Sequence, residues 1–297
     1  MTDAHQVLPK SQFGHLVEHH PCFNEEAHFK FGRIHLPVSP ACNIQCRFCR
    51  RDYNKWEQRP GVSRRLLTPA AAVEMVARAI EDCPELTVVG IAGPGDALAT
   101  NQAIETFRLL HETFPGLGKC LSTNGLLLAQ KAEELIQVGV KTVSVTVNAV
   151  DPEVLRQICA AIVLDGRHYS GSEGAQILIR AQVEGIAKIH ALGAVVKVNT
   201  VLIPGINDGH IERVAKVVSE SGASLINVIP LIPQFGFAGL RAPDCRELES
   251  ARAAAEEYLP VFRHCRQCRA DACGIPGLGE DLAGHLYDES FQTFSHG

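Results

Sequence analysis

The chain has 297 residues, of which 46% are hydrophobic and 21% charged, and 28 Lys and Arg against 33 Asp and Glu leave a formal net charge of −5. This length is enough to bury a sizeable core, and the hydrophobic fraction excludes general disorder. The mild acidic balance argues against a nucleic-acid partner bound through its phosphates. With neither a signal-peptide pattern nor a run of about 18 apolar residues to span a bilayer, we expect a cytoplasmic protein without a membrane partner.

Short apolar segments alternate with amphipathic ones after a polar leader. The apolar segments predict strands at 34–38, 86–92, 118–122, 141–148, 194–202 and 224–230. The amphipathic segments predict helices near 69–82, 101–113, 126–138, 151–163, 176–192 and 207–221. Six strand–helix units in a row predict a parallel sheet with right-handed crossovers. The expected fold class is therefore α/β, a partial (β/α)6 TIM-type barrel with N- and C-terminal extensions.

The two extensions flank this barrel. Residues 1–33 form a leader that we expect to fold over the barrel, which itself spans 34–240. The C-terminal segment 241–297 is expected to hold one more helix, over 244–263, and then a Cys-rich tail. The polar Gly- and Ser-rich stretch 164–175 is interpreted as a mobile lid before the fifth helix.

Alternation along the strands predicts a polar lumen. In 143–148, valines alternate with Ser144, Thr146 and Asn148, and successive strand residues face opposite sides. Since helices should cover the apolar side, the polar side should line the barrel cavity. The same alternation predicts that further residues of the neighbouring strands face the lumen: His35, Cys120, Ser122, Asn124, Lys197, Asn199 and Val201. Agreement among several strands favours an occupied lumen over isolated buried hydrogen bonds.

Eleven cysteines are the most unusual feature of the composition. In a reducing compartment, metal binding or catalysis is a more common use of clustered thiols than disulfides. Cys42, Cys46 and Cys49 form a CxxxCxxC motif directly after the first predicted strand. A zinc site would need a fourth ligand from elsewhere. A cubane iron–sulfur cluster bound by three thiolates would instead keep one iron open.

The CxxxCxxC motif, with Phe48 before its last cysteine, resembles the radical S-adenosylmethionine (SAM) superfamily, whose partial barrel agrees with the predicted topology. The resemblance implies a [4Fe–4S] cluster whose open iron is chelated by the amino and carboxylate groups of SAM. An electron from that cluster then cleaves SAM to a 5′-deoxyadenosyl radical.

Further SAM contacts are implied by position. The segment Gly93, Pro94, Gly95 and Asp96 resembles the superfamily's GGE segment, which holds the SAM amino group, although Pro94 and Asp96 replace a Gly and the Glu. Two strand ends at the carboxyl-terminal mouth supply candidates for ribose, carboxylate and adenine contacts, with a structural role as the alternative: Thr146, Asn148, Asn199 and Val201.

Two more groups of possible metal ligands lie outside this motif. Cys265, Cys268 and Cys273 follow the barrel in a pattern typical of metal sites, for which a structural zinc knuckle is the alternative. A dispersed group, in which each member alone is more often an ordinary buried residue, comprises Cys22, His35 and Cys120.

Taken together, the segments HPCFNEEAHFKFGRIHLPVSPACNIQCRFC, VNTVLIPGIND and HCRQCRADACG resemble the NifB family of nitrogenase cofactor maturases, in the stand-alone form without a fused NifX-like domain. The resemblance implies a carbide synthase that fuses two [4Fe–4S] substrate clusters, K1 and K2, into an [8Fe–9S–C] cluster (NifB-co). One SAM methylates a sulfide of K2, and the radical from a second SAM abstracts hydrogen from that methyl group.

The resemblance also implies roles for individual residues. Cys22 and Cys120 would hold K1, with His35 as an exchangeable third ligand. K2 would be held by Cys265, Cys268 and Cys273, with a buried thiol as the alternative for Cys273. Glu57 aligns with a family glutamate that could touch a cluster or a proton, with a solvated loop carboxylate as the alternative. The residues expected to have no role are His19, His20 and His28, as exposed leader histidines, and Cys83, Cys159 and Cys245, on helices or their ends.

The implied partners are cluster donors and NifB-co acceptors of the nitrogenase assembly pathway, and a reductant such as ferredoxin or flavodoxin. One alternative is another radical SAM enzyme with an auxiliary cluster, which would not need Cys22, His35 and Cys120 to converge on the lumen. The other is a non-enzymatic iron–sulfur scaffold, which would use the same thiols without a SAM site.

Overall fold

A curled seven-stranded sheet forms the centre of the computed structural model, which describes residues 14–279, 281–287 and 295–296. The strand order is β11-β10-β7-β6-β5-β1-β12, and all neighbours are parallel except β1 and β12. These strands are β1 (Gly32–His35), β5 (Leu86–Ile91), β6 (Gly118–Thr123), β7 (Val140–Thr146), β10 (Val195–Leu202), β11 (Leu225–Pro230) and β12 (Cys273–Gly274). The six parallel strands confirm the predicted partial barrel.

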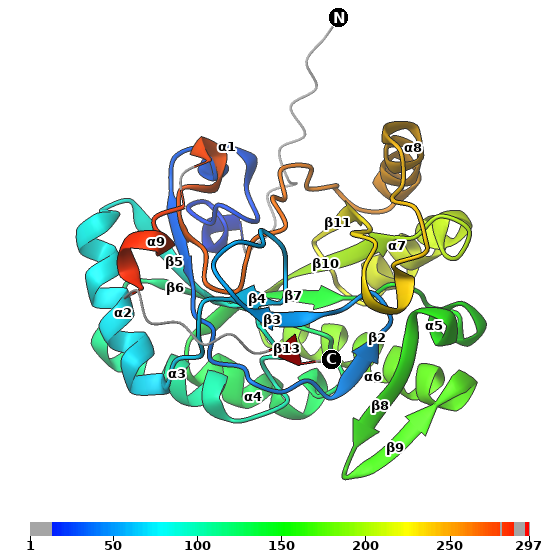
Figure 1. Cartoon of the computed structure of the whole chain (residues 1–297), viewed down its shortest axis with the longest axis horizontal. Helices are drawn as coiled ribbons and strands as arrows, with labels where there is room; N and C mark the ends of the chain where they lie inside the picture. Colours follow the sequence, from blue (N-terminus) through cyan, green and yellow to red (C-terminus); the bar gives the residue numbers. More distant parts are fainter. Residues whose placement is uncertain (1–13, 280, 288–294, 297) are drawn as a thin grey trace, which may run out of the picture.

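Helices cover the outer side of this sheet (Figure 1). They are α2 (Pro69–Asp82), α3 (Gln102–Thr113), α4 (Leu128–Gln137), α5 (Pro152–Ile158), α6 (Gly171–Ala191), α7 (Ile211–Glu220) and α8 (Cys245–Glu256), with the short α9 (Ala283–Leu286). The other short helix, α1 (Glu25–His28), belongs to the leader. Single 3-10 turns occur at Gly14–Leu16, Asp208–His210, Phe235–Phe237 and Pro276–Leu278. The alternating valines of β7, Val143 and Val145, are buried in the core beneath the helices, as predicted. Within the described residues, no helix has the length and apolarity needed to cross a membrane.

The end of the helix expected near 151–163 and the stretch 164–175, interpreted as a mobile lid, instead form a β-hairpin and the start of the next helix. Helix α5 ends at Ile158, and the chain continues as β8 (Cys159–Leu164) and β9 (Arg167–Ser170). The turn residues Asp165 and Gly166 both have positive φ, 51° and 73°, which is the backbone of the Asp-Gly hairpin turn. Strand β8 also pairs antiparallel with β2 (Ile44–Cys46), inside the CxxxCxxC motif. The predicted helix was therefore wrong beyond Ile158, and a mobile lid at 164–175 stays a prediction.

A second small sheet lies beside the CxxxCxxC segment. It is formed by β3 (Arg51–Tyr53), β4 (Val62–Ser63) and β13 (Ser295–His296). The helix expected over 244–263 ends earlier, at Glu256.

The described part of the leader packs against the amino-terminal end of the barrel. Val17 and Phe23 form an apolar cluster with Val195 and Leu225, the first residues of β10 and β11. Lys197 donates from Nζ to the Cys22 carbonyl at 2.8 Å, which ties the leader to the lumen side of β10. Residues 1–13 of the expected leader lie outside the described residues.

The segment after α8 crosses the open side of the partial barrel. At one edge, the Phe262 amide donates to the Ile226 carbonyl of β11 at 2.8 Å. At the other edge, Cys273 pairs with Ile34 of β1. Between them, the buried Arg269 guanidinium donates to the backbone carbonyls of Asn54 and Glu57, both at 2.6 Å. Residues 280, 288–294 and 297 of the expected tail lie outside the described residues.

Removal of the Asp271 carboxylate should loosen this crossing segment. Asp271 accepts from Arg269 at 2.7 Å and from the Arg64 amide at 2.6 Å, and both side chains of the Arg269–Asp271 pair are fully buried. Asp271→Ala leaves a buried cation without its partner, so we expect the free energy of unfolding to fall by about 3–5 kcal/mol. Denaturant unfolding measures this loss. Glu133→Ala, which breaks an exposed pair with Lys188, is the control, and equal stability of the two variants would contradict the prediction.

Candidate functional site: two adjoining cavities

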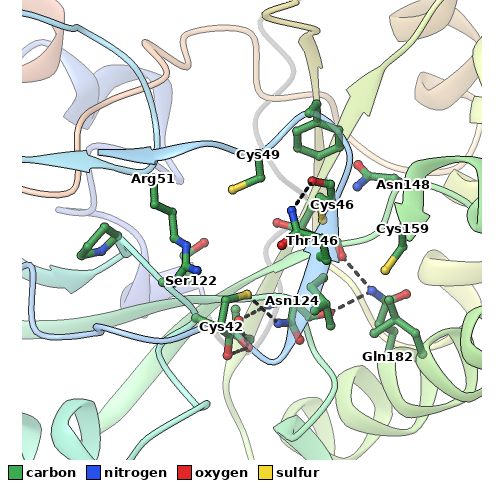
Figure 2. A pocket seen from close by; sticks show the side chains of 18 of the residues that line it. Cys42, Cys46, Cys49, Arg51, Ser122, Asn124, Thr146, Asn148, Cys159 and Gln182 are labelled. Atoms are coloured by element: carbon green, nitrogen blue, oxygen red, sulfur yellow. Dashed lines mark hydrogen bonds between the residues drawn. The ribbon is translucent and has the colours of Figure 1, made fainter. Parts of the chain in front are cut away.

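The three cysteines of the CxxxCxxC motif line one cavity of about 180 Å³ at the carboxyl ends of the strands. Cys42 and Cys49 lie on the loops that flank β2, and Cys46 ends that strand. Figure 2 shows the three side chains around this cavity, with Asn124 and Thr146 from the ends of neighbouring strands. The structure thus brings the predicted cysteine group together.

Burial controls the protonation of these thiols. It raises the pKa of Cys42 to about 12, with the nearby Asp96 carboxylate adding to the effect. Burial also raises the pKa values of Cys46 and Cys49. A cationic iron centre reverses this preference, because it stabilises thiolates directly. Three soft sulfur donors in one enclosed cavity therefore fit an iron–sulfur cluster.

Among the described residues, no three His, Cys, Asp or Glu side chains converge on a single metal-ion position. A cubane presents different irons to different thiolates, so its ligands need not meet at one point.

The glycine-rich segment after β5 forms a second wall of this cavity. The Gly95 amide donates to the Ser39 carbonyl at 2.8 Å, and a Cβ on Gly95 would lie 2.1 Å from the Ala41 carbonyl oxygen. Only glycine fits so close to another backbone. Asp96 is buried and accepts hydrogen bonds from the amides of Leu98, at 2.9 Å, and Asn124, at 2.6 Å. Its carboxylate therefore holds the turn after β6, although burial still raises its pKa.

The four strand-end candidates divide between two cavities. Thr146 lines both cavities, Asn148 only the smaller one, and Asn199 and Val201 only a larger neighbouring one. Asn148 accepts a hydrogen bond from the Val201 amide at 2.9 Å, so its side chain also links β7 to β10.

Gln182 of α6 lines the smaller cavity as well and was missed from the sequence. Its Nε2 donates to the carbonyls of Asn124, at 2.8 Å, and Thr146, at 2.9 Å, and among the described residues its buried Oε1 has no hydrogen-bond partner. Gln182 lies four residues from both Leu178 and Ile186 on the buried face of α6, and a polar residue on that apolar face was the signal in the sequence.

Cys159 lies in the smaller cavity too, which corrects its assignment as a bystander on a helix. It begins β8, directly opposite Cys46 in the β2–β8 pairing, and its Sγ donates to the Ala161 carbonyl at 3.4 Å. The cause is the hairpin, which replaces the helix expected there. Cys83 is buried in the core and Cys245 is exposed, and neither lines a cavity.

The other predicted ligands, except Cys273, converge on the larger cavity, of about 330 Å³. Its lining includes Cys22 from the leader, His35 from β1, Cys120 from β6, and Cys265 and Cys268 from the crossing segment. It adjoins the smaller cavity, because both are lined by Phe48, Cys49, Ala92, Pro94, Ser122 and Thr146.

His35 is held as a neutral imidazole with a defined free nitrogen. Its Nδ1 donates to the Arg269 carbonyl at 3.0 Å, which leaves the lone pair on Nε2, because a carbonyl only accepts. Burial, with the charge of Arg33 nearby, lowers the pKa of His35 to about 4. A neutral ring oriented by a backbone carbonyl is the usual form of a metal-binding histidine.

Two leader histidines expected to be exposed are buried against the same cavity. The Cys22 amide donates to His20 Nδ1 at 3.1 Å, so the proton of this ring lies on Nε2. His28 Nδ1 donates to the Pro21 carbonyl at 2.8 Å, so its lone pair lies on Nε2. In the part of the chain that the structure describes, neither Nε2 has a hydrogen-bond partner. The capping of α1 by the Asn24 side chain, visible in the sequence as Asn-Glu-Glu, was the signal that this segment is ordered. His19 is exposed, as expected.

Two predicted site residues lie away from both cavities. Glu57 accepts hydrogen bonds from Asn54, at 2.7 Å, and Arg59, at 2.9 Å; although burial raises its pKa, these bonds leave it below its usual value. Cys273 is fully buried in the core beside β1, so its thiol faces helices rather than the lumen. The expectation that Cys273 is a cluster ligand is corrected here, because Cys273 pairs with the buried Ile34 on the hydrophobic side of the sheet.

The comparisons with known proteins agree with this geometry. Residues 36–218 match the model of the Radical SAM superfamily. The FeMo cofactor biosynthesis protein NifB of Methanocaldococcus infernus is 47% identical over 267 residues, covering 89% of this chain and 88% of that protein. The protein of the same name from Klebsiella pneumoniae is also 47% identical, over 88% of this chain but 57% of its own length. Among solved structures, methylornithine synthase (PylB) shares the fold, with a TM-score of 0.53 at 16% identity over 79% of this chain and 65% of that one.

The close approach at Gly95 gives a direct test of the smaller cavity. Gly95→Ala forces the glycine-rich segment away from Ala41, so we expect SAM affinity to fall by about tenfold or more. Equilibrium binding of SAM to the reconstituted protein measures the change. Gly116→Ala, where an added Cβ meets nothing within 4 Å, is the matched control. Parental affinity in Gly95→Ala would show that this segment does not contact SAM.

Proposed function

Because the chain belongs to the NifB family of the radical SAM superfamily, we propose that it is a carbide synthase of FeMo-cofactor biosynthesis. In this proposal it inserts a SAM-derived carbide while fusing two [4Fe–4S] substrate clusters into an [8Fe–9S–C] cluster. The observation that supports it is the convergence of the leader, the barrel strands and the crossing segment on one thiol-lined cavity beside the CxxxCxxC cavity.

Cys42, Cys46 and Cys49 would hold the resident [4Fe–4S] cluster, and Gly95 would bring its backbone close to SAM. When bound, the cluster supplies the electron that cleaves SAM to a 5′-deoxyadenosyl radical. The chain's own contribution is to enclose this chemistry: Phe48 and Pro94 form part of the wall shared with the larger cavity. A radical formed beside that wall would be close to a substrate in the larger cavity.

The larger cavity would hold the two substrate clusters. Cys22 and Cys120 bind one of them, with His35 Nε2 as its third ligand, and Cys265 and Cys268 bind the other. Burial raises the pKa of Cys22 to about 12, so this thiol would lose its proton only when a strongly cationic partner such as iron binds the sulfur in its place. A neutral imidazole binds iron less tightly than a thiolate, so His35 is the ligand suited to release when the clusters fuse.

The partners in this proposal are cluster donors and acceptors of nitrogenase assembly and a reductant such as ferredoxin or flavodoxin, all in the cytoplasm. A cluster scaffold without enzymatic activity is the second candidate, and the thiols of the larger cavity would suit it equally well. SAM cleavage separates the two, since a scaffold does not form 5′-deoxyadenosine.

Iron content and SAM cleavage test the assignment of three cluster sites. Anaerobic reconstitution should give about twelve irons per chain, and Cys42→Ala should reduce this to about eight and abolish 5′-deoxyadenosine formation. Iron analysis and product quantification after dithionite reduction measure both. Saturation near four irons in the parent protein would overturn the proposal, whereas twelve irons without SAM cleavage would favour the scaffold.

His35→Ala tests the nitrogen ligand. In the parent protein, we expect pulsed EPR to show a nitrogen hyperfine coupling on an auxiliary cluster. In His35→Ala this coupling should disappear while 5′-deoxyadenosine formation continues, because His35 lines only the larger cavity. His168→Ala, which removes an exposed imidazole on β9, is the control and should leave the coupling in place. Coupling that persists in His35→Ala would assign the nitrogen to another residue.

A further inference from the structure

The charges around the larger cavity are of one sign. Its cationic lining residues, histidines aside, are Arg33, Lys197 and Arg266, and no Asp or Glu occurs among the described residues that line it. Lined by cations and thiols without carboxylates, the cavity is suited to an anionic occupant. An iron–sulfur unit held by thiolates is such an occupant, and its net charge is one of the properties that set its reduction potential.

Among these cations, Arg33 contacts a proposed cluster ligand directly. Its Nη2 donates to Cys268 Sγ at 3.1 Å, and its Nη1 donates to the Gly274 carbonyl at 2.7 Å. It occupies β1 two residues before His35, so both side chains face the lumen. The guanidinium is buried, and its Nε has no hydrogen-bond partner among residues 14–279, 281–287 and 295–296. The planar guanidinium therefore joins the Gly274 carbonyl of β12 to the Cys268 sulfur, and its Nε–H is not used by these contacts.

The charge of Arg33 lies between the two groups of substrate ligands. Beyond its hydrogen bond to Cys268, Arg33 lies close enough to Cys22 to interact with that side chain electrostatically. Cys268 belongs to one proposed cluster and Cys22 to the other. A fixed cation in this position stabilises negative charge at both sites at once.

The other two cations are differently placed. Lys197 donates to the Cys22 carbonyl, and its ammonium lies over the rings of Phe23, at 4.6 Å, and Phe262, at 5.3 Å. These contacts hold the leader. Arg266 is exposed, so water screens its charge.

We propose that Arg33 is a positioning residue for the iron–sulfur substrate, which orients Cys268 through an N–H···S hydrogen bond and offsets the negative charge of the two clusters as they approach. This inference rests on the proposed function. Hydrogen bonds to ligand sulfurs and nearby positive charge both stabilise the reduced, more negative cluster, so Arg33 should raise the reduction potential of the cluster on Cys265 and Cys268.

The test uses the full chain with Cys42, Cys46 and Cys49 all changed to Ala, so that signals come only from the auxiliary clusters. EPR-monitored redox titration of the reconstituted protein gives their reduction potentials. Arg33→Gln should shift one potential to a more negative value, because both the charge and the fork are lost. Arg33→Lys keeps the charge but reaches only one acceptor, and its potential should lie between those of the parent and Arg33→Gln.

Arg266→Gln is the matched control, because it removes a cation from the same lining at an exposed position and should shift the potential less. Equal potentials in Arg33→Gln and Arg266→Gln would overturn the role of Arg33. If Arg33→Gln does not bind iron, the potential of Arg33→Lys provides the test. A potential equal to that of the parent would overturn the role of Arg33 as a positioning residue, and a more negative potential would support it. A parent that binds no auxiliary iron would overturn the proposed function itself, and the role of Arg33 with it.

Discussion

An open parallel sheet needs something to close it, and in this chain the buried Arg269–Asp271 pair holds that closure in place. The six parallel strands leave a gap between β11 and β1, which the segment after α8 crosses. Arg269 has no access to water, so its guanidinium must satisfy its donors inside the protein, on Asp271 and the carbonyls of the 54–57 loop. This requirement sets where the neighbouring Cys268 lies.

The same residue links the two groups of substrate ligands. The Arg269 carbonyl accepts the Nδ1 proton of His35, and its neighbour Cys268 accepts from Arg33. A ligand proposed for one cluster and a ligand proposed for the other are therefore oriented by one short stretch of backbone. Displacement of that stretch would change both sites together, which suits a reaction that must bring two clusters into one product.

The barrel and its lumen could be predicted because they depend on local pattern. The alternation of valine with Ser144 and Thr146 places polar residues inside, and the CxxxCxxC spacing is specific. The position of Cys159 was missed because a short amphipathic segment before an Asp-Gly turn is compatible with either a helix or a hairpin. Pairing with β2, which the local sequence does not show, selects the hairpin. His20 and His28 were missed because their burial depends on contacts with Phe262 and Lys197, far away in sequence.

The two cavities differ in electrostatics, although they share a wall. The smaller one contains a buried carboxylate, Asp96, which accepts hydrogen bonds from Thr123, Asn124 and Leu98. These bonds hold the turn after β6 rigid where SAM is proposed to bind. The larger one has cations and neutral histidines but no carboxylate among its described lining. The smaller cavity pairs the Asp96 carboxylate with one cation, Arg51, so its lining is more nearly balanced in charge. The larger cavity therefore favours an anionic substrate more strongly than the proposed SAM site does.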